Sequence, residues 1–187
     1  MDIKHKSIEI ITGCMFSGKT EELIYRINLA QKQGFTTALF KPEKDNRYHT
    51  KNIVSHNGSS IESVAIKNSS DILKQISNIQ VIGIDEAQFF DNAIIDICHQ
   101  LATENYRIIL SGLDKDYLNN PFGPMPGLIS ISENITQLAA ICHQCGGEAF
   151  NNFKKTKSKT LIEIGETDIY EARCYECYKK GMQISNH

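Results

Sequence analysis

Residues 13–20 form the segment that most restricts how this chain can fold. They read Gly-Cys-Met-Phe-Ser-Gly-Lys-Thr, which is the full G-x-x-x-x-G-K-[ST] pattern of a phosphate-binding loop. A mostly apolar run at residues 8–11 precedes the loop and predicts a buried strand. Apolar residues at helical spacing follow over residues 21–33, and Gly34 ends that predicted helix. The chain is therefore expected to begin as the strand, glycine loop and helix of a P-loop fold.

Each residue type in this loop has a physical role in holding ATP with Mg²⁺. Glycines let the backbone turn so that successive N–H groups converge on phosphate oxygens, and the following helix adds a favourable dipole. The Lys19 ammonium is expected at the β- and γ-phosphates, and the Thr20 hydroxyl at Mg²⁺. A chance glycine turn is the alternative, and it leaves the flanking strand and helix unexplained. The predicted ATP-binding loop consists of Gly13, Cys14, Met15, Phe16, Ser17, Gly18, Lys19 and Thr20.

A second apolar run, residues 81–84, ends in the two carboxylates Asp85 and Glu86. In doubly wound sheets the strand C-termini line the ligand crevice, so Asp85 is predicted to hold Mg²⁺ together with Thr20. Glu86 then faces the reacting phosphate, where it could accept a proton from an attacking hydroxyl or water. An ordinary acidic strand end is the alternative. The phosphate loop elsewhere in the same chain favours the catalytic interpretation.

The rest of the pattern predicts an α/β fold, namely a P-loop (RecA-like) core with a mainly parallel sheet plus a small zinc-binding lid domain. Its other expected elements are strands at residues 35–40, 53–56 and 107–113 and helices at residues 70–77 and 93–103. Residues 119–127 hold three of the four prolines and predict a structured loop. The character of the sequence changes near Thr136. We therefore predict a nucleotide-binding domain over residues 1–135 and a zinc-binding domain over residues 136–187.

Four of the six cysteines form two Cys-x-x-Cys pairs, Cys142 with Cys145 and Cys174 with Cys177. Two such pairs can give a closed, tetrahedral Zn²⁺ site of four thiolates. The intervening segment, residues 146–173, is longer than in the usual zinc patterns, and free thiols or a redox pair are the alternatives. We predict structural zinc, because two such pairs in one short module are hard to explain otherwise.

The charge balance of the chain is close to neutral, with 20 basic and 22 acidic residues. Proteins whose main task is to coat nucleic acid are usually clearly basic, so a nucleic-acid partner is not expected. Residues 1–6 lack the apolar stretch of a signal peptide, and no window approaches a membrane span. We therefore expect a cytoplasmic protein without a membrane partner.

Several sequence blocks follow one another in a characteristic order. The blocks are Met-Phe-Ser-Gly-Lys-Thr in the loop, Asp-Asn-Arg-Tyr at residues 45–48, Asp-Glu-Ala-Gln-Phe-Phe at residues 85–90, Pro-Phe-Gly at residues 121–123 and the two cysteine pairs. Together and in this order they resemble the thymidine kinases of the cytosolic type II family. The resemblance runs from about residue 8 to residue 178. It implies an ATP-dependent kinase that phosphorylates the 5′-hydroxyl of thymidine or deoxyuridine to give dTMP, a step of pyrimidine salvage for DNA synthesis. It also implies a homotetramer with dTTP as feedback inhibitor.

The resemblance also implies roles for individual residues, with Glu86 as the general base for the 5′-hydroxyl. To the ATP site it adds Arg47, Asp85, Glu86, Ala87 and Gln88. It places around the nucleoside Met15, Asp45, Phe89, Leu113, Tyr117, Phe122, Asn152, Ile162, Ile164 and Tyr170. From the residues alone, Phe89 and Phe122 could equally be core side chains. The family commonly carries Thr and Arg where this chain has Asn152 and Lys154, and a lysine cannot copy a bidentate arginine contact.

Two other functions fit part of the pattern. A P-loop ATPase acting on nucleic acid would use the same two motifs, with Glu86 activating water. The near-neutral charge balance and the small size weigh against it. A zinc-ribbon interaction module would explain the cysteines but leaves the phosphate loop unexplained.

Overall fold

A six-stranded sheet forms the centre of the protein, in a computed structural model that describes residues 7–43, 52–54, 60–156 and 169–185. The strand order is β5-β2-β6-β7-β1-β8, and all five pairings are parallel. The strands are β1 (Ser7–Gly13), β2 (Thr37–Pro42), β5 (Val64–Ile66), β6 (Val81–Ile84), β7 (Arg107–Gly112) and β8 (Asn134–Leu138). This confirms the predicted α/β class with its parallel sheet.

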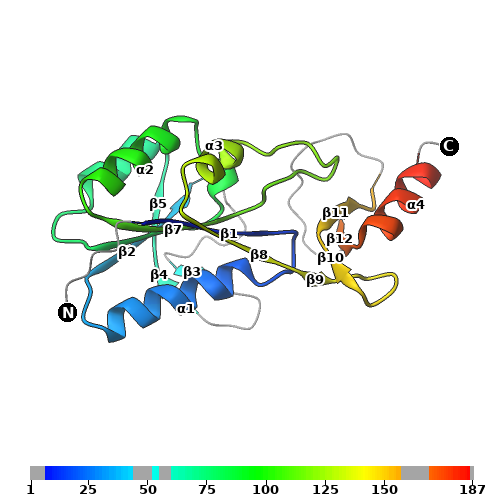
Figure 1. Cartoon of the computed structure of the whole chain (residues 1–187), viewed down its shortest axis with the longest axis horizontal. Helices are drawn as coiled ribbons and strands as arrows, with labels where there is room; N and C mark the ends of the chain where they lie inside the picture. Colours follow the sequence, from blue (N-terminus) through cyan, green and yellow to red (C-terminus); the bar gives the residue numbers. More distant parts are fainter. Residues whose placement is uncertain (1–6, 44–51, 55–59, 157–168, 186–187) are drawn as a thin grey trace.

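Helices cover both faces of the sheet, giving three layers (Figure 1). On one face α1 (Lys19–Lys32) packs through residues such as Leu23 and Ile27 against Ile11 and Ile109. The opposite face is covered by the 3₁₀ turn η1 (Ser69–Lys74) and the helices α2 (Ala93–Thr103) and α3 (Met125–Ser130). Successive residues of a strand point to opposite faces, so the continuous apolar runs supply both layers.

The order of the strands decides where functional groups can meet. Strands β6, β7 and β1 are neighbours, and they run parallel, so their carboxyl ends lie at one edge of the sheet. The phosphate loop leaves β1 at this edge, Asp85 follows β6, and Ser111 lies near the end of β7. The topology thus brings together side chains that are far apart in sequence.

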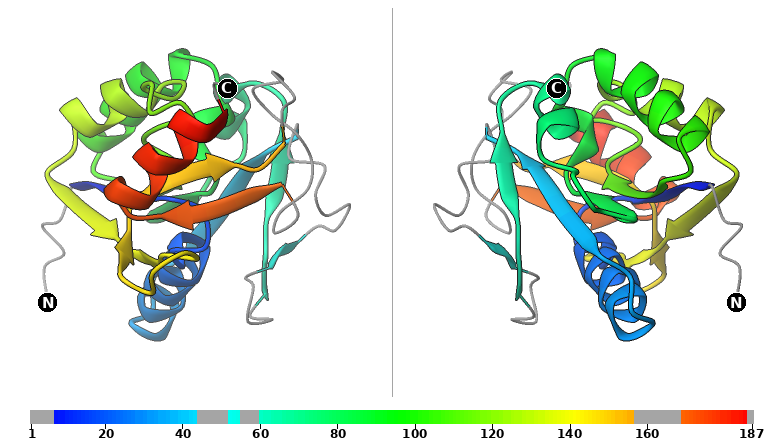
Figure 2. Two further views of the ribbon diagram at one scale, coloured as in Figure 1. Left: turned by 90° about the vertical axis from the view of Figure 1, so that its right-hand side faces the viewer. Right: turned by 90° about the vertical axis from the view of Figure 1, so that its left-hand side faces the viewer.

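A small C-terminal module lies beyond this edge of the sheet. It contains the strand pairs β9 (Ala140–Ile141) with β10 (Glu148–Ala149) and β11 (Asn151–Lys154) with β12 (Tyr170–Arg173). Helix α4 (Tyr175–Ser185) lies across the β11–β12 hairpin, as the left view of Figure 2 shows. The predicted division between residues 135 and 136 falls within β8, which pairs with β1 in the central sheet.

Several elements differ from the sequence prediction for local reasons. The strand predicted at residues 35–40 begins instead at Thr37, because Gly34 turns at φ 90° and the Phe35 N–H still bonds to the carbonyl of Ala30 in α1. Residues predicted as a helix at 70–77 form the shorter η1. Helix α3 starts inside the predicted loop, after Pro124 at its N-cap. The short strand β3 (Asn52–Val54) pairs with β4 (Ser60–Glu62), also a short strand.

No helix in the described ranges combines the length and the apolar character needed to cross a bilayer.

Candidate active site and metal centre

The phosphate loop has the backbone of an anion cradle. Gly13, Phe16 and Gly18 have φ of 145°, 66° and 84°, and a Cβ at Gly13 would lie 2.3 Å from the carbonyl oxygen of Leu138. Gly13 is therefore required by the close approach of β8 as well as by its φ. The Ser17 Oγ atom is buried and has no hydrogen-bond partner among the described residues. A buried hydroxyl in this position fits a loop that receives phosphate oxygens.

Thr20 and Asp85 lie together at the foot of this cradle. The Thr20 hydroxyl is 3.2 Å from Oδ2 and 3.4 Å from Oδ1 of Asp85, and the Ser111 hydroxyl also donates to Asp85. Burial, and then the charge of Glu86, raise the pKa of Asp85 to about 6. A buried carboxylate beside a hydroxyl is an oxygen donor set suited to Mg²⁺, whose charge would offset that cost. The two predicted Mg²⁺ ligands thus fit one cation.

Ser111 is a contact that the sequence prediction missed. Its signal is positional, since it is the penultimate residue of β7, the strand next to β6 in the sheet. The register pairs Ile84 with Leu110, so the residues that follow them, Asp85 and Ser111, are brought side by side. Strand adjacency cannot be read from the sequence, and without it nothing distinguishes this serine from any other.

Glu86 is held in an unusual conformation directly after Asp85. Its φ and ψ are 52° and 42°, in the left-handed region that non-glycine residues seldom occupy. The side-chain nitrogen of Gln88 donates to the Glu86 carboxylate, and the side-chain oxygen Oε1 of Gln88 accepts a hydrogen bond from the Leu113 N–H at 3.0 Å. Gln88 is only 2% exposed and lies in the 3₁₀ turn η2 (Ala87–Phe89). The amide of Gln88 therefore links the Glu86 carboxylate to the backbone that follows β7.

The predicted nucleoside wall consists of side chains that are only partly buried. Those described are Met15, Phe89, Leu113, Tyr117 and Phe122, all of intermediate exposure. The rings of Phe89 and Phe122 meet edge to face with centroids 5.6 Å apart. The Lys154 ammonium lies 5.1 Å from the Tyr117 ring centroid. Partial exposure distinguishes these side chains from the fully buried core of the sheet.

Two further predicted nucleoside residues lie in the C-terminal module. Tyr170 is buried in β12, opposite Lys154 of β11. Asn152 is buried in β11, and both ends of its side-chain amide bond within the protein, one to Met15 N–H and one to the carbonyl of Lys115. The remaining predicted site residues, Asp45, Arg47, Ile162 and Ile164, lie outside the described residues.

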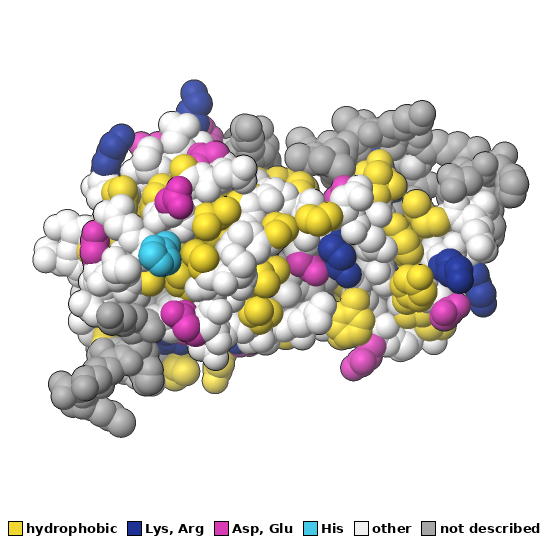
Figure 3. Space-filling model, turned by 45° about the horizontal axis from the view of Figure 1, so that its top comes forward, with side chains coloured by type: hydrophobic (Ala, Val, Ile, Leu, Met, Phe, Trp, Pro, Cys, Tyr) yellow, Lys and Arg dark blue, Asp and Glu magenta, His cyan; other side chains and the backbone are white. Residues whose placement is uncertain are grey.

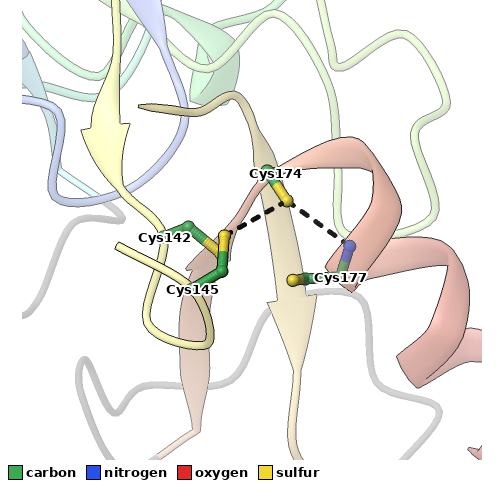
Figure 4. Close-up of side chains that lie close together, drawn as sticks. All are labelled: Cys142, Cys145, Cys174 and Cys177. Carbon is green, nitrogen blue, oxygen red and sulfur yellow. Dashed lines mark hydrogen bonds between the residues drawn. The ribbon is translucent and has the colours of Figure 1, made fainter. Parts of the chain in front are cut away.

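The four paired cysteines converge in the module, as Figure 4 shows. Cys142 and Cys145 lie between β9 and β10, and Cys174 and Cys177 lie at the start of α4. Their sulfur atoms all lie within 4.8 Å of one another, and Cys145 Sγ is 3.7 Å from Cys174 Sγ. Four sulfurs around one Zn²⁺ at about 2.3 Å would have nearly this mutual spacing. All six cysteines are free, so the cluster contains no disulfide.

The crowding of the four sulfur atoms shifts the pKa values of the thiols in opposite directions. Burial raises the pKa of Cys142, but backbone hydrogen bonds from Cys174, Gln144 and Cys145 outweigh it and lower the pKa to about 6. The pKa of Cys177 rises to about 12, chiefly through its hydrogen bond with the Cys174 side chain. Four adjacent thiolates repel one another, so a divalent cation is needed to hold all four ionised. The cluster can therefore hold Zn²⁺.

Comparison with known proteins decides which P-loop family this chain represents. The thymidine kinase family profile matches residues 6–178. The thymidine kinase of Bacteroides fragilis is 46% identical over 176 residues, which is 94% of this chain and 88% of the relative. The chain belongs to the thymidine kinase family. This confirms the resemblance predicted from the sequence and the enzyme class, since thymidine kinases are ATP-dependent phosphotransferases.

Other members of this family show comparable similarity to the chain. The thymidine kinase of Bacteroides thetaiotaomicron is 47% identical over 174 residues, 93% of this chain and 87% of the relative. That of Porphyromonas gingivalis is 42% identical over 178 residues, 95% of this chain and 87% of the relative. Among solved structures, AMPPCP-bound DnaA from Aquifex aeolicus aligns with a TM-score of 0.45 and 13% identity. The alignment covers 73% of this chain and 43% of DnaA, and no functional conclusion follows from it.

Proposed function

We propose that this thymidine kinase transfers the γ-phosphate of ATP to the 5′-hydroxyl of thymidine or deoxyuridine, with Glu86 accepting the hydroxyl proton. The observation that supports it most is the position of Glu86. Its carboxylate follows the Asp85 that neighbours Thr20 of the phosphate loop, and Gln88 holds it in place. A base fixed beside the phosphate site can meet a hydroxyl aligned with the γ-phosphate.

Phosphoryl transfer depends on alignment and charge neutralisation more than on covalent chemistry. In our proposal the backbone N–H groups of residues 13–20 and the Lys19 ammonium bind the phosphates. Thr20 and Asp85 hold Mg²⁺, which when bound offsets charge on the β- and γ-phosphates. Lys19 donates to the carbonyl of Cys14 at 2.8 Å, so its ammonium is already directed along the loop. Arg47 and Asp45 are proposed to complete the site, with Ala87 adjoining Glu86.

The nucleoside is proposed to lie against the partly exposed wall of Met15, Phe89, Leu113, Tyr117 and Phe122. Aromatic and methionine side chains suit a flat pyrimidine, because they offer a large contact area and lose little conformational freedom. Tyr170, with Ile162 and Ile164, is proposed to cover the nucleoside from the C-terminal module. Asn152 is not proposed to contact the base, since both ends of its side-chain amide bond within the protein.

We propose several further properties that the family resemblance supports. The four-cysteine cluster is proposed to carry a structural Zn²⁺, and residues 136–187 to act as a lid domain on the core of residues 1–135. We propose a homotetramer inhibited by dTTP, testable by light scattering and by inhibition assays. The free cysteines suit a reducing compartment, and we propose the cytoplasm.

A P-loop ATPase acting on nucleic acid is disfavoured by the family, and the face drawn in Figure 3 agrees with that. On the face drawn in Figure 3, lysine and arginine side chains are few and are interspersed with acidic ones. A backbone-binding surface would instead gather basic side chains. An assay of ATP consumption separates the two functions, since thymidine should stimulate the kinase and DNA should not.

The assignment of Glu86 is tested by Glu86→Gln, which keeps the shape of the side chain and removes its basicity. We expect kcat to fall by about 10²–10⁴-fold, with thymidine affinity changed only slightly. Glu104→Gln is the matched control, because it makes the same change at an exposed residue directly after α2, and it should keep full activity. Formation of dTMP by Glu86→Gln at a rate near that of the unchanged protein would rule out Glu86 as the base.

A further inference from the structure

The phosphate loop is attached to the C-terminal module through three successive residues. The Cys14 thiol donates to the carbonyl of Ala149 at 3.2 Å, and the Met15 N–H donates to Asn152 Oδ1 at 2.7 Å. The Phe16 ring lies against that of His143, next to Cys142, with centroids 5.8 Å apart. Contacts from consecutive loop residues fix the loop backbone against the module rather than touching it at one point.

The packing around these contacts joins the loop directly to the metal ligands. Cys14 belongs to a buried cluster that also contains the ligand Cys142, together with Ala140, Ala149 and Ala172. Phe16 and the ligands Cys174 and Cys177 pack against the same cluster. A change in the position of the cysteines therefore reaches the phosphate loop through atoms in contact.

Asn152 is the most specific of the three attachments. It is 5% exposed, and its amide uses both of its functions, accepting from Met15 N–H and donating to the Lys115 carbonyl at 3.2 Å. Lys115 belongs to the loop after β7, and the carbonyl of Tyr117 in this loop also accepts the Tyr178 hydroxyl of α4 at 2.9 Å. The side chain thus connects β11 to two loops of the P-loop core. A carboxamide carries its acceptor oxygen and its donor nitrogen on separate atoms, so one side chain can bond to both loops at once.

We propose that Asn152 is a positioning residue that couples the four-cysteine metal site to the phosphate loop, so that filling the metal site raises the affinity for ATP. The inference concerns nucleotide binding and does not rest on thymidine as acceptor. A loop held in its binding conformation loses less entropy when phosphate binds. Coupling of this kind is reciprocal, so bound nucleotide must also retain the metal more tightly.

Nucleotide binding to Asn152→Ala, in the full-length zinc-loaded protein, gives the first test. We expect the Kd for a Mg²⁺-bound non-hydrolysable ATP analogue, measured by calorimetry, to rise about 5- to 30-fold, because the partly buried Met15 N–H loses its acceptor. The Kd for thymidine should change much less. Asn151→Ala is the matched control, since Asn151 is equally buried in the same strand but its amide donates to the carbonyl of Arg173, inside the module.

Release of zinc to a coloured chelator gives the second test, which needs no catalysis. The ATP analogue should slow release from the unchanged protein and from Asn151→Ala, and this protection should be reduced in Asn152→Ala. The protection in Asn152→Thr, which keeps one oxygen acceptor, should lie between those of Asn152→Ala and the unchanged protein, and this variant serves if the alanine variant does not fold.

Equal analogue affinity and equal protection in Asn152→Ala and Asn151→Ala would overturn the proposal. So would a weakened thymidine Kd with unchanged nucleotide binding, which would return Asn152 to contact with the base. A protein that binds the analogue as expected but forms no dTMP would refute the proposed function and leave this inference standing.

Discussion

The P-loop core and the C-terminal module are stabilised in different ways. The core buries large aliphatic and aromatic side chains on both faces of its sheet, among them Ile82, Leu110 and Phe40. The buried cluster beside the four paired cysteines consists of alanine and cysteine side chains, one of them Cys14 of the phosphate loop. Elsewhere the module buries the larger side chains of Phe153, Tyr170 and Tyr178. Burial of apolar area stabilises roughly in proportion to that area, so the small side chains contribute little. We therefore expect the proposed Zn²⁺ to contribute more to the stability of the module than to that of the core.

Removal of the metal should produce the largest difference between the two regions. Zinc binding to four thiolates contributes about 10 kcal/mol or more to the folding of small zinc modules. After chelation we expect the amide protons of β11, β12 and α4 to lose their protection against hydrogen exchange. Those of β1, β6 and β7 should keep theirs. Protection that falls equally in both regions would mean that the core also needs the metal.

A cavity in the core should destabilise it without releasing zinc. Ile82 in the centre of β6 is fully buried, and Ile82→Ala should lower the free energy of unfolding by about 2–5 kcal/mol. The same substitution at Ile141 of the module, which is 75% exposed, is the matched control and should change stability by less than about 0.5 kcal/mol. Urea unfolding measures the free energy of unfolding, and metal analysis measures the zinc content of each variant. If folded Ile82→Ala held less than one zinc per chain, the stability of the core and the metal binding of the module would not be independent.

A smaller effect is expected from the ion pairs that join β1 to β7 and to α1 in the core. Glu9 in β1 bonds to Arg107 at 2.6 Å and to Arg26 at 3.0 Å. Burial raises the pKa of Glu9, but the two arginines outweigh it and hold the pKa below its usual value of 4.5. The stabilisation is therefore complete above pH 4.5 and is lost as the pH falls through the lower, folded-state pKa.

Glu9→Gln should accordingly lower the free energy of unfolding by about 1–3 kcal/mol at pH 7. The gap between Glu9→Gln and the unchanged protein should narrow as the pH is lowered below 4.5, which urea unfolding at several pH values can follow. Glu22→Gln removes a more exposed partner of Arg26 and should change stability by less than about 1 kcal/mol. A gap that widens on acidification would show that the carboxylate of Glu9 is not what stabilises the strands.

The elements that could be predicted from the sequence are those whose structure depends on neighbouring residues along the chain. Residues 13–20 have few conformations that satisfy their glycines and the flanking apolar runs, and they form the predicted loop. The helix at residues 93–103 was predicted with its observed bounds, because its apolar spacing is regular. The short strands of the module were not predicted, since strands of two to four residues carry too little pattern to be recognised.

What the sequence by itself determined is the chemistry available to the enzyme: a phosphate loop, two adjacent carboxylates and four cysteines in pairs. Only the tertiary structure decided which of these groups meet. The strand order places Ser111 beside Asp85, and the docking of β11 places the Asn152 amide between two loops of the core. The physical reason is that hydrogen bonds between residues distant in sequence depend on strand adjacency and register, which sequence spacing does not encode. The resemblance implied that Asn152 lies around the nucleoside, and only the fold shows that its amide bonds to Met15 and Lys115.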